Sequence, residues 1–572
     1  MRQQVLDSNP IERERGITIK LAPVRMKYVL PAHLQKILNS PASPAGRQFS
    51  ILNLIDTPGH VDFSYEVSRS LRACEGIILV VDATQGIQAQ TVAHMQLIKE
   101  AGLTVIPVIN KIDLPGAKIA QVKKAICQAF GFNDKDVIDI SAKDGTNIDQ
   151  VLEAVVARIP PPSGKTSLPL RSLVFSSLYD PHKGVIIYVR IMDGEIDNKK
   201  SCQFHASKAI FTPLEVGVFT PQMIKVDKLQ AGEVGYVATG LKDLSFARVG
   251  DTLTHEDSSC QPLPGYKEPK PMVFLSLFPT DNNEYLHLRE ALEKLHLSDS
   301  SFTFKPHASL ALGKGFLCGF LGLLHAEIVK ERLEREFSLD IIATTPTVEY
   351  TISLTGGETL LIHTPDDFPD PSRIKIILEP VMYAVIYAPR EYVGSIMQLC
   401  QDKRAELVNL EYVSGQAKFT YLIPLSEMII DFFDSLKSIT SGYASLDYEF
   451  FELRPVTAVK LDILLNRKPV EAFSQIVVSQ KAVKIGNKMV EKLKTLIPRH
   501  QFQIPIQAAV GGKIIARADV KSFRKDVTAK LYGGDQTRKD KLLEAQKKGK
   551  KRMRQFGEVN IPQEVFLNIY KS

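Results

Sequence analysis

The 572-residue sequence contains no tryptophan, only six cysteines and no long hydrophobic run. The cysteines are widely scattered, so none of them form the close pairs that zinc sites and redox motifs require. The longest apolar stretches, residues 76–81 and 103–109, fall far short of the roughly 18 residues that a membrane span needs. These absences exclude a structural metal and a transmembrane segment, and they indicate a reducing compartment.

A targeting peptide is also missing from the first ten residues, which have neither an apolar secretory core nor an Arg- and Ser-rich amphipathic stretch. Hydrophobic residues make up 44% of the chain and charged residues 24%, values typical of an ordinary globular protein. At this length one hydrophobic core is not enough, so we expect three to five domains.

The positive charge is concentrated near the C-terminus. Residues 521–554 contain 13 Lys and Arg and 4 Asp and Glu, so their net charge is 13 − 4 = +9. This exceeds the net charge of +7 of the whole chain, which leaves the rest of the chain slightly acidic. Such a block is either a solvated helix face or a surface that contacts the phosphates of nucleic acid. Charge alone does not decide between the two.

The order of apolar runs and turn residues predicts five domains of mixed α/β and β structure. Residues 49–159 alternate short β-branched runs (51–55, 76–81, 104–109 and 137–140) with helical stretches, which is typical of βαβ units on a parallel sheet. Strand-like segments at 172–178, 185–192 and 233–238 predict a small β-barrel. Two proline-rich linkers, residues 160–162 and 262–271, separate this barrel from the neighbouring domains.

Two ferredoxin-like units are predicted after the barrel. Residues 380–455 give the order strand 381–388, helix 390–403, hairpin 407–413 and 417–423 turned at Ser414-Gly415, helix 427–439 and strand 444–451. A similar unit spans 272–350 with residues 322–337 as its helix. The predicted domains are therefore residues 1–161, 163–265, 270–350, 376–455 and 456–572.

The motif Asp56-Thr57-Pro58-Gly59-His60 follows the apolar strand 51–55. An Asp at the carboxyl end of a parallel strand reaches the ligand crevice and can bind Mg²⁺. Gly59 lets a backbone N–H approach a terminal phosphate, and His60 is placed to orient a water. The alternative is a simple strand-ending turn, which Asp, Pro and Gly also favour.

Two further motifs follow later strands. Asn110-Lys111-Ile112-Asp113 comes after strand 104–109, and Ser141-Ala142-Lys143 comes one strand later. The Asp113 carboxylate can accept two hydrogen bonds from guanine, whereas adenine would leave it unpaired. Asn110 can bond the base or brace the loop, the Lys111 stem can lie over the ring, and the Ala142 N–H can meet the guanine oxygen. Three motifs in this order make coincidental turns a poor explanation.

These motifs resemble those of the translational GTPases. Residues Glu12 to Thr18 (ERERGIT) resemble their first switch, and the resemblance implies that Thr18 ligates Mg²⁺ through its hydroxyl and senses the terminal phosphate through its backbone. DTPGHVDFSYEV resembles their second switch, in which His60 positions the attacking water, with Gly59 beside it. The resemblance thus implies GTP as substrate, Asp56 and Thr18 as ligands of Mg²⁺, and Lys143 as part of the guanine loop.

The family also has a G-x-x-x-x-G-K-[ST] phosphate loop ahead of the first switch, and this chain departs from it. Only 17 residues precede Thr18, and Gly164-Lys165-Thr166 and Gly313-Lys314 both lack the required first glycine. We interpret the chain as a truncated form of an active enzyme whose GTPase domain lacks its N-terminal strand. Such a form should expose apolar edge surface and be poorly stable.

The C-terminal region closely resembles the signature of the LepA (elongation factor 4) family, although Leu531 stands where a Cys is usual. It runs from Tyr532-Gly533-Gly534 through the basic stretch to Gly557. The resemblance implies contacts to ribosomal RNA and tRNA. The residues assigned to these contacts are Lys521, Arg524, Lys525, Tyr532, Arg538, Lys539, Lys541, Lys547, Lys548, Lys550, Lys551, Arg552 and Arg554.

Two smaller features have competing interpretations. Gly322 to Glu327 resembles a helix of elongation factor G, but apolar residues at helical spacing favour packing over function for His325. Ser441-Gly442-Tyr443-Ala444 indicates a helix-to-strand turn first and an RNA contact second.

Resemblance to LepA covers the chain from Glu12 to Tyr570. It implies a monomeric, ribosome-dependent GTPase that shifts tRNAs backward on wrongly translocated ribosomes. The competing hypothesis is a ribosome-binding protein that has lost GTP turnover. The segment 441–449 and the insertion 30–48 resemble the organellar branch, which predicts the mitochondrial matrix, with association to the inner membrane and a bacterial-type cytoplasm as the alternatives.

Overall fold

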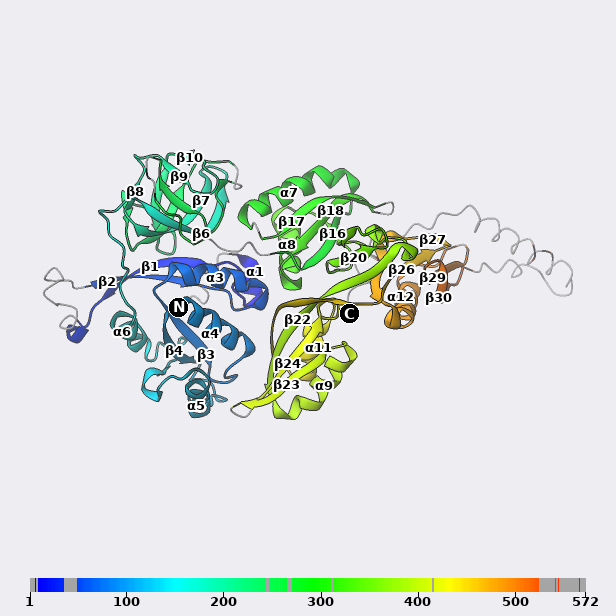
Figure 1. The fold of residues 1–572 in the computed structure, drawn as a ribbon, viewed down its shortest axis with the longest axis horizontal. Helices are drawn as coiled ribbons and strands as arrows, with labels where there is room; N and C mark the ends of the chain where they lie inside the picture. The colour runs from blue at the N-terminus through cyan, green and yellow to red at the C-terminus, as the bar shows by residue number, and fades with distance from the viewer. Residues whose placement is uncertain are drawn as a thin grey trace, which may run out of the picture.

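The computed structural model describes residues 6, 9–34, 49–242, 246–256, 258, 260–264, 270–299, 301–309, 312–413, 416–500, 502–523, 541, 544 and 565. Figure 1 shows the domains as separate bodies: the N-terminal domain (residues 9–161) lies beside the β-domain (163–265), and the two α+β domains (272–350 and 350–455) lie between these and the C-terminal domain. The mixed α/β and β multidomain fold predicted from the sequence is confirmed.

The N-terminal domain contains two small sheets covered by helices. Asn9 caps the first of its helices, and Gly16, Gly102 and Gly131 in the left-handed conformation end α1, α4 and α5. The elements are α1 (Pro10–Arg15), β1 (Ala22–Val29), β2 (Phe49–Asp56), η1 (Val61–Phe63), α3 (Ser64–Ala73), β3 (Gly76–Asp82), α4 (Ala89–Ala101), β4 (Thr104–Asn110), α5 (Ile119–Phe130), η2 (Asp134–Asp136), β5 (Ile138–Asp139) and α6 (Ile148–Arg158).

The four predicted strands do not share one parallel sheet, so that prediction is wrong in part. β3, β4 and β5 form a parallel sheet, whereas β2 pairs antiparallel with β1 in a sheet of its own. A β-branched run indicates a strand but not which neighbour it takes. β2 and β3 carry exposed apolar side chains, with Val80 55%, Ile51 43% and Leu54 37% exposed, as the expected apolar surface would have, while the truncation itself stays a prediction.

The β-domain is built from antiparallel strands around a core that includes Val174, Val189 and Leu253. One sheet has the order β10-β9-β15-β6-β7-β14-β11-β12, and β13 pairs with β8. The strands are β6 (Arg171–Asp180), β7 (Gly184–Asp193), β8 (Glu195–Asp197), β9 (Cys202–Phe204), β10 (Ile210–Phe211), β11 (Glu215–Phe219), β12 (Met223–Lys225), β13 (Lys228–Gln230), β14 (Val234–Ala238) and β15 (Thr252–His255). The three strands predicted here are confirmed as β6, β7 and β14.

The first α+β domain has the ferredoxin-like order βαββαβ. Its elements are β16 (Val273–Pro279), η4 (Asn282–Glu284), α7 (Tyr285–Ser298), β17 (Thr303–Ser309), β18 (Gly313–Phe320), α8 (Leu323–Glu336) and β19 (Ile341–Ala343), and the strand order in the sheet is β17-β18-β16-β19. The predicted helix 322–337 is confirmed as α8. Leu288, Leu292 and Leu333 from the two helices pack against the sheet in one core.

The second α+β domain repeats this order and adds two strands. β20 (Tyr350–Leu354), β21 (Thr359–Ile362), η5 (Pro365–Asp367) and η6 (Pro371–Arg373) precede β22 (Ile374–Pro389), η7 (Arg390–Tyr392), α9 (Val393–Asp402), β23 (Glu406–Val413), β24 (Gln416–Pro424), α10 (Leu425–Met428), α11 (Phe432–Ile439) and β25 (Ser445–Pro455). The hairpin is confirmed, while its turn at Ser414-Gly415 lies outside the described residues. The single predicted helix 427–439 is wrong, because the backbone leaves the helix between Ile429 and Asp431, where Asp431 pairs with Lys403.

In residues 456–523 of the C-terminal domain, a helix packs against an antiparallel sheet. Its elements are β26 (Ala458–Leu465), β27 (Lys468–Pro469), η8 (Glu471–Phe473), β28 (Gln475–Val478), η9 (Ser479–Lys481), α12 (Ala482–Leu496), β29 (Ile504–Val510) and β30 (Lys513–Val520). Val490 and Leu493 of the helix are buried against Ile463 and Ile506 of the sheet. Of the residues that the structure describes, no helix is both long and apolar enough to cross a membrane.

Candidate functional site

The ends of β4 and β5 bring two of the predicted motifs together. Ile112 donates its N–H to the Ile140 carbonyl at 3.3 Å, which joins the two loops. The Asn110 side-chain oxygen accepts the N–H of Ala142 at 3.0 Å, and the Asp113 carboxylate accepts the Ser141 hydroxyl at 2.8 Å. We call these loops, residues 110–113 and 141–143, the guanine rim.

The sequence left two roles open for Asn110, bonding the base or bracing the loop, and its contacts in the structure are those of a brace. Because its side chain accepts the N–H groups of Lys111 at 2.7 Å and Ala142 at 3.0 Å, Asn110 braces the loop. The Ala142 N–H, which was expected to meet a guanine oxygen, is engaged by Asn110 in this structure. Asp113, Ala142 and Lys143 are exposed, so the rim opens outward.

Lys111 has a backbone and a side chain that suit a cover for a planar ring. Its φ of 66° lies in the left-handed region, which non-glycine residues rarely adopt. Its ammonium contacts the Asp82 carboxylate at 2.7 Å, at the end of β3. Burial raises the pKa of Asp82, but hydrogen bonds from Lys111 and Thr84 outweigh it and hold that pKa below its ordinary value. The Lys111 stem is thereby stretched between two strand ends.

The end of β2 carries the third motif. The Thr57 N–H donates to the Asp56 carboxylate at 3.0 Å, and Pro58 and Gly59 follow in an extended loop. A Cβ at Gly59 would meet nothing within 4 Å, so its backbone faces open space that a ligand can enter. The Phe63 N–H donates to the His60 carbonyl at 3.0 Å, which closes the short turn leading into α3.

Thr18 lies in the segment that connects α1 to β1. Gly16, with a φ of 65°, ends α1, and β1 then pairs Ala22 with Asp56. This register brings the Thr18 segment and Asp56 to the same end of the two-stranded sheet. The buried Glu12 carboxylate fixes the segment by accepting the N–H groups of Asn9, Ile19 and Lys20 at 3.0, 3.0 and 3.1 Å.

The His60 imidazole packs against a residue of another domain. Its ring lies edge-to-face on Phe433 of α11, with centroids 5.8 Å apart, and 6.4 Å from Phe63. Nδ1 accepts the Asp62 N–H at 3.2 Å, so a neutral ring carries its proton on Nε2. Burial lowers the pKa of His60, Asp62 raises it and Lys437 lowers it further, with a net result below the ordinary value. His60 is therefore neutral near pH 7.

Sequence reasoning assigned no role to Asp62, although it stands in the quoted motif. Its carboxylate is buried and accepts the backbone N–H groups of Leu324 and His325 in α8 and the hydroxyl of Tyr448 in β25. Tyr448 and the nearby Ser445 lie in β25, within the predicted strand 444–451, for which no site role was expected. Nothing in the sequence places residues so far apart in contact.

A second group missed from the sequence is a buried polar cluster in and just after the switch loops, which are residues 9–20 and 56–63. Lys20 donates to the Ser177 carbonyl of the β-domain at 2.6 Å, and burial lowers its pKa. Glu66 accepts from Arg69 at 3.0 Å, its other oxygen is buried without a hydrogen bond, and burial raises its pKa. These charges lie where the N-terminal domain meets the β-domain and the first α+β domain.

The two smaller features resolve as packing and turn. His325 is 1% exposed, accepts the Leu321 N–H at 3.3 Å and contacts Asp299 at 2.9 Å, so the packing interpretation is confirmed. Ser441 and Gly442 have φ values of 50° and 81°, which confirms the turn. Tyr443 is 57% exposed, and the RNA contact proposed for this segment stays a prediction.

The predicted RNA-binding residues fall mostly outside the described part of the chain. Lys521 follows β30 and is exposed, and Lys541 is exposed and helical. Arg524, Lys525, Tyr532, Arg538, Lys539, Lys547, Lys548, Lys550, Lys551, Arg552 and Arg554 lie outside the described residues.

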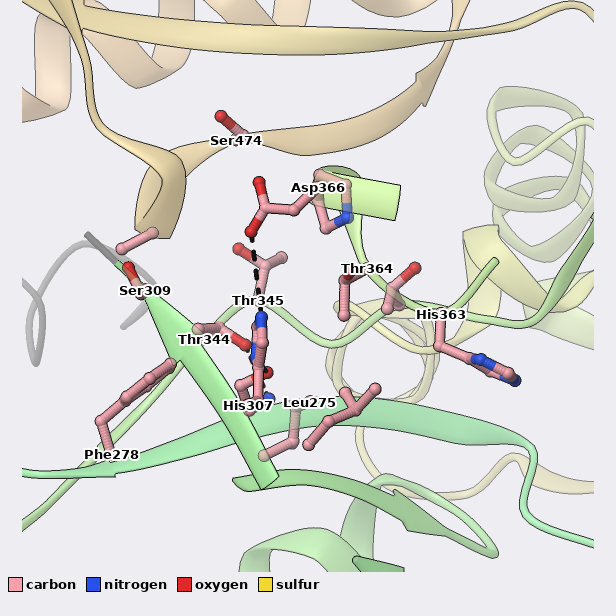
Figure 2. Close-up of a pocket in the computed structure, with 15 residues that line it drawn as sticks. Leu275, Phe278, His307, Ser309, Thr344, Thr345, His363, Thr364, Asp366 and Ser474 are labelled. Atoms are coloured by element: carbon pink, nitrogen blue, oxygen red, sulfur yellow. Dashed lines mark hydrogen bonds and ion pairs between the residues drawn. The ribbon is translucent and has the colours of Figure 1, made fainter. Parts of the chain in front are cut away.

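A separate cavity, of about 420 Å³ including space open to solvent, lies where the first α+β domain, residues 363–366 and the C-terminal domain meet. Figure 2 shows His307 pointing toward Asp366, with Nε2 to Oδ2 at 4.0 Å, whereas the hydroxyl of Ser474 from the C-terminal domain points away from them and donates to Asp462 at 3.1 Å. His307 also contacts the Ser276 hydroxyl at 2.7 Å. None of the predicted nucleotide residues lines this cavity, so it is not part of the site.

The donor set at the end of β2 fits Mg²⁺. Among the described residues no three His, Cys, Asp or Glu side chains gather at one point, which argues against a metal site made by the protein alone. Mg²⁺ typically takes one or two protein oxygens and completes its shell with phosphates and water. Asp56 and Thr18, brought to one end of the β1–β2 sheet, are donors of this kind.

Comparison of the sequence with known families and proteins gives consistent matches along the chain. Residues 1–161 match the elongation factor Tu GTP binding domain, 376–464 the elongation factor G C-terminus, and 465–571 the GTP-binding protein LepA C-terminus. Elongation factor 4 of Acetivibrio thermocellus is 52% identical over 574 residues, spanning all of this chain and 93% of that protein. Elongation factor 4 of a Picosynechococcus species is 50% identical over 573 residues, with the same coverage.

A solved structure supports the fold alone. A Thermus thermophilus protein with a crystal structure aligns over 79% of this chain and 91% of its own, with a TM-score of 0.52 and 17% sequence identity. At that identity the alignment shows a shared arrangement of domains. The sequence matches are identical at about half the residues over the full length of the chain, so they show family membership as well as fold.

Proposed function

Because the chain belongs to the elongation factor 4 (LepA) family of translational GTPases, we propose that it acts on the ribosome as a rescue factor that moves tRNAs backward after faulty translocation. The observation that carries the GTPase part is the guanine rim, where Asp113 is held by Ser141 and Asn110 by Ala142. The family relationship supports the ribosomal role. The direction of tRNA movement is our proposal alone.

The guanine rim supplies substrate selection. Asp113 is fixed at the rim and can accept the N1–H and exocyclic amine of guanine, while adenine offers no matching pair. Lys111, stretched toward Asp82, presents its stem to one face of the base. Ser141 orients the Asp113 carboxylate, and Lys143 and Ala142 complete the edge of the pocket.

The switch loops supply the phosphate end. The loop at the end of β2 approaches the terminal phosphate with Thr57, Pro58 and the N–H of Gly59. Gly59 has no side chain to obstruct this approach. Asp56 and Thr18 are the residues that would hold Mg²⁺, which neutralises phosphate charge when bound. His60, neutral and donating from Nε2, is suited to orient a water rather than to carry a positive charge.

The basic C-terminal region supplies the proposed contact with ribosomal RNA and tRNA. The match to the LepA C-terminus and the concentration of Lys and Arg in residues 521–554 support it. Lys521 and Lys541 are exposed, as phosphate contacts require. We further propose that the factor acts as a monomer in the mitochondrial matrix, and peripheral association with the inner membrane belongs to the same proposal.

A hydrolysis assay tests the proposal. Phosphate release from GTP is measured with a full-length clone that carries the family's phosphate loop, tested alone, with purified ribosomes, and with ATP in place of GTP. We expect ribosomes to stimulate hydrolysis of GTP at least tenfold and to leave ATP intact. Ribosome binding without any stimulation would favour the non-enzymatic alternative, and no binding at all would reject both.

A further inference from the structure

Helix α8 of the first α+β domain begins without a cap of its own. Its N-cap residue is Gly322, which has no side chain to accept a hydrogen bond, so the N–H groups of its first turn need an outside partner. Asp62 of the N-terminal domain provides it: one carboxylate oxygen accepts the Leu324 N–H at 2.9 Å and the His325 N–H at 3.4 Å. The helix is capped in trans, across a domain boundary.

The other oxygen of Asp62 is held by the second α+β domain. The Tyr448 hydroxyl of β25 donates to it at 3.1 Å. Burial and the Asp62 carboxylate both raise the pKa of Tyr448 well above its ordinary value, so the hydroxyl stays a donor. Within the described residues no Lys or Arg forms an ion pair with Asp62. Its buried charge is balanced by the positive end of α8 and by these three donors.

Gly322 shows how tightly the carboxylate is seated. A Cβ at this position would lie 2.2 Å from the Asp62 carboxylate, closer than any real contact, so any larger residue must displace Asp62. The backbone at Gly322 is extended and imposes no glycine requirement by itself. A side chain at this position would therefore act on the site by moving Asp62.

Asp62 and the second α+β domain also set the position of His60. The Asp62 N–H donates to His60 Nδ1 at 3.2 Å, and the ring packs on Phe433, which belongs to the same domain as Tyr448. Ser445 lies three residues before Tyr448 and accepts the Ala89 N–H of α4 at 2.8 Å. β25 therefore contacts the N-terminal domain at two points. If Asp62 moves, the loop that carries His60 moves with it.

We propose that Asp62 is a positioning residue of the GTPase site, which holds the His60 loop in place by capping α8 and accepting the Tyr448 hydroxyl. This inference rests on the proposed function of His60. Movements of either α+β domain, such as those that accompany docking on a large partner, are transmitted to His60 through the two oxygens of one carboxylate. The coupling needs no change at the guanine rim.

The test uses Gly322→Ala, which displaces Asp62 while leaving every charged group of the site in the chain. Tyr448→Phe is the second variant, because it removes one hydrogen bond and keeps the ring. Gly394→Ala is the matched control, since a Cβ there meets nothing within 4 Å. The titrating groups that face His60 are Asp62 and Lys437, and all three variants retain both.

Two measurements are made on the full chain. The His60 ring signal, assigned by its loss in His60→Gln, is titrated by NMR, and hydrogen exchange is followed at the first-turn amides of α8. We expect Gly322→Ala to shift the His60 pKa, because both the burial of the ring and its distance from Asp62 change, and to speed exchange at Leu324 about tenfold. Tyr448→Phe should shift both in the same direction by less, and Gly394→Ala should change neither.

Hydrolysis separates the inference from the function on which it rests. In the ribosome-stimulated assay, Gly322→Ala should lower kcat about tenfold or more, because His60 is displaced, and change the KM for GTP less than about twofold. An unchanged His60 titration and an unchanged kcat in Gly322→Ala would overturn the proposal. If the titration shifts but the wild-type chain hydrolyses no GTP, the positioning role holds and the proposed function fails.

Discussion

The guanine rim and the switch loops are held in place in opposite ways. Every contact that fixes the rim comes from the N-terminal domain itself: Asn110 to Ala142, Asp113 to Ser141 and Lys111 to Asp82. The switch loops, residues 9–20 and 56–63, lean on the other domains, through Asp62 on α8 and β25 and through Arg15 on α8. Substrate selection is thus a local property, while positioning of His60 is shared by three domains.

The largest expected effect tests the local half of this comparison. Asp113→Ala removes the carboxylate that pairs with guanine, so we expect GTP affinity to fall about 100-fold or more and preference over ATP to vanish. Calorimetric titration with both nucleotides measures this. Asp144→Ala, which removes an exposed carboxylate of the same loop, serves as the control and should bind GTP normally. Equal losses in both variants would mean that the loop, not Asp113, carries the selection.

A middle-sized effect concerns the contact between the N-terminal and second α+β domains. Burial, then Glu449, raises the pKa of Asp447 to about 6. Asp447 lies on the same face of β25 as Ser445, the face that α4 packs against. A carboxyl whose pKa is raised on folding stabilises the fold below its unfolded pKa, and that contribution is lost as pH rises through about 6.

Asp447→Asn should therefore stabilise the chain at pH 8 by about 1 kcal/mol, discounted for its partial exposure, and the gain should shrink toward pH 5. Thermal unfolding at both pH values gives the answer. The exposed Asp434→Asn of the same domain is the control. A gain that is independent of pH would show that titration of Asp447 is not its source.

The smallest effect tests the first switch. Arg15 pairs with Glu331 at 2.8 Å and Glu327 at 3.2 Å across the boundary to α8. Such pairs contribute little, so Arg15→Ala should weaken docking of residues 9–20 by about 0.5 kcal/mol, and high salt should erase the difference. Hydrogen exchange of that segment measures it. Arg289→Ala, which breaks a pair inside α7 alone, should leave the segment unchanged.

Much of the fold was predictable because its signals are local. The order of strands and helices in residues 380–455 follows from apolar periodicity and turn residues, and the ferredoxin-like sheet β23-β24-β22-β25 follows from that order. The pairing of β2 was not predictable, because a strand of residues 51–55 reads the same in either sheet. The break in the helix at Ile429–Asp431 was not predicted either, and Asp431 pairs there with Lys403 from elsewhere in the chain.

The site divides along the same line. The motifs at Asp56, Asn110 and Ser141 stand out in the sequence, because each follows a strand and contains residue types that bind a nucleotide. Asp62 does not, since its partners Leu324 and Tyr448 lie in other domains and offer a backbone N–H and a common side chain. Only the three-dimensional arrangement shows that a side chain at Gly322 would move Asp62.

One measurement tests the central claim directly: the affinities for GTP and ATP of a full-length clone that carries the phosphate loop, compared between the wild-type chain and Gly322→Ala. The account predicts a clear preference for GTP that is the same in both, because the guanine rim does not depend on the other domains. No preference in the wild-type chain, or a preference lost in Gly322→Ala, would contradict it.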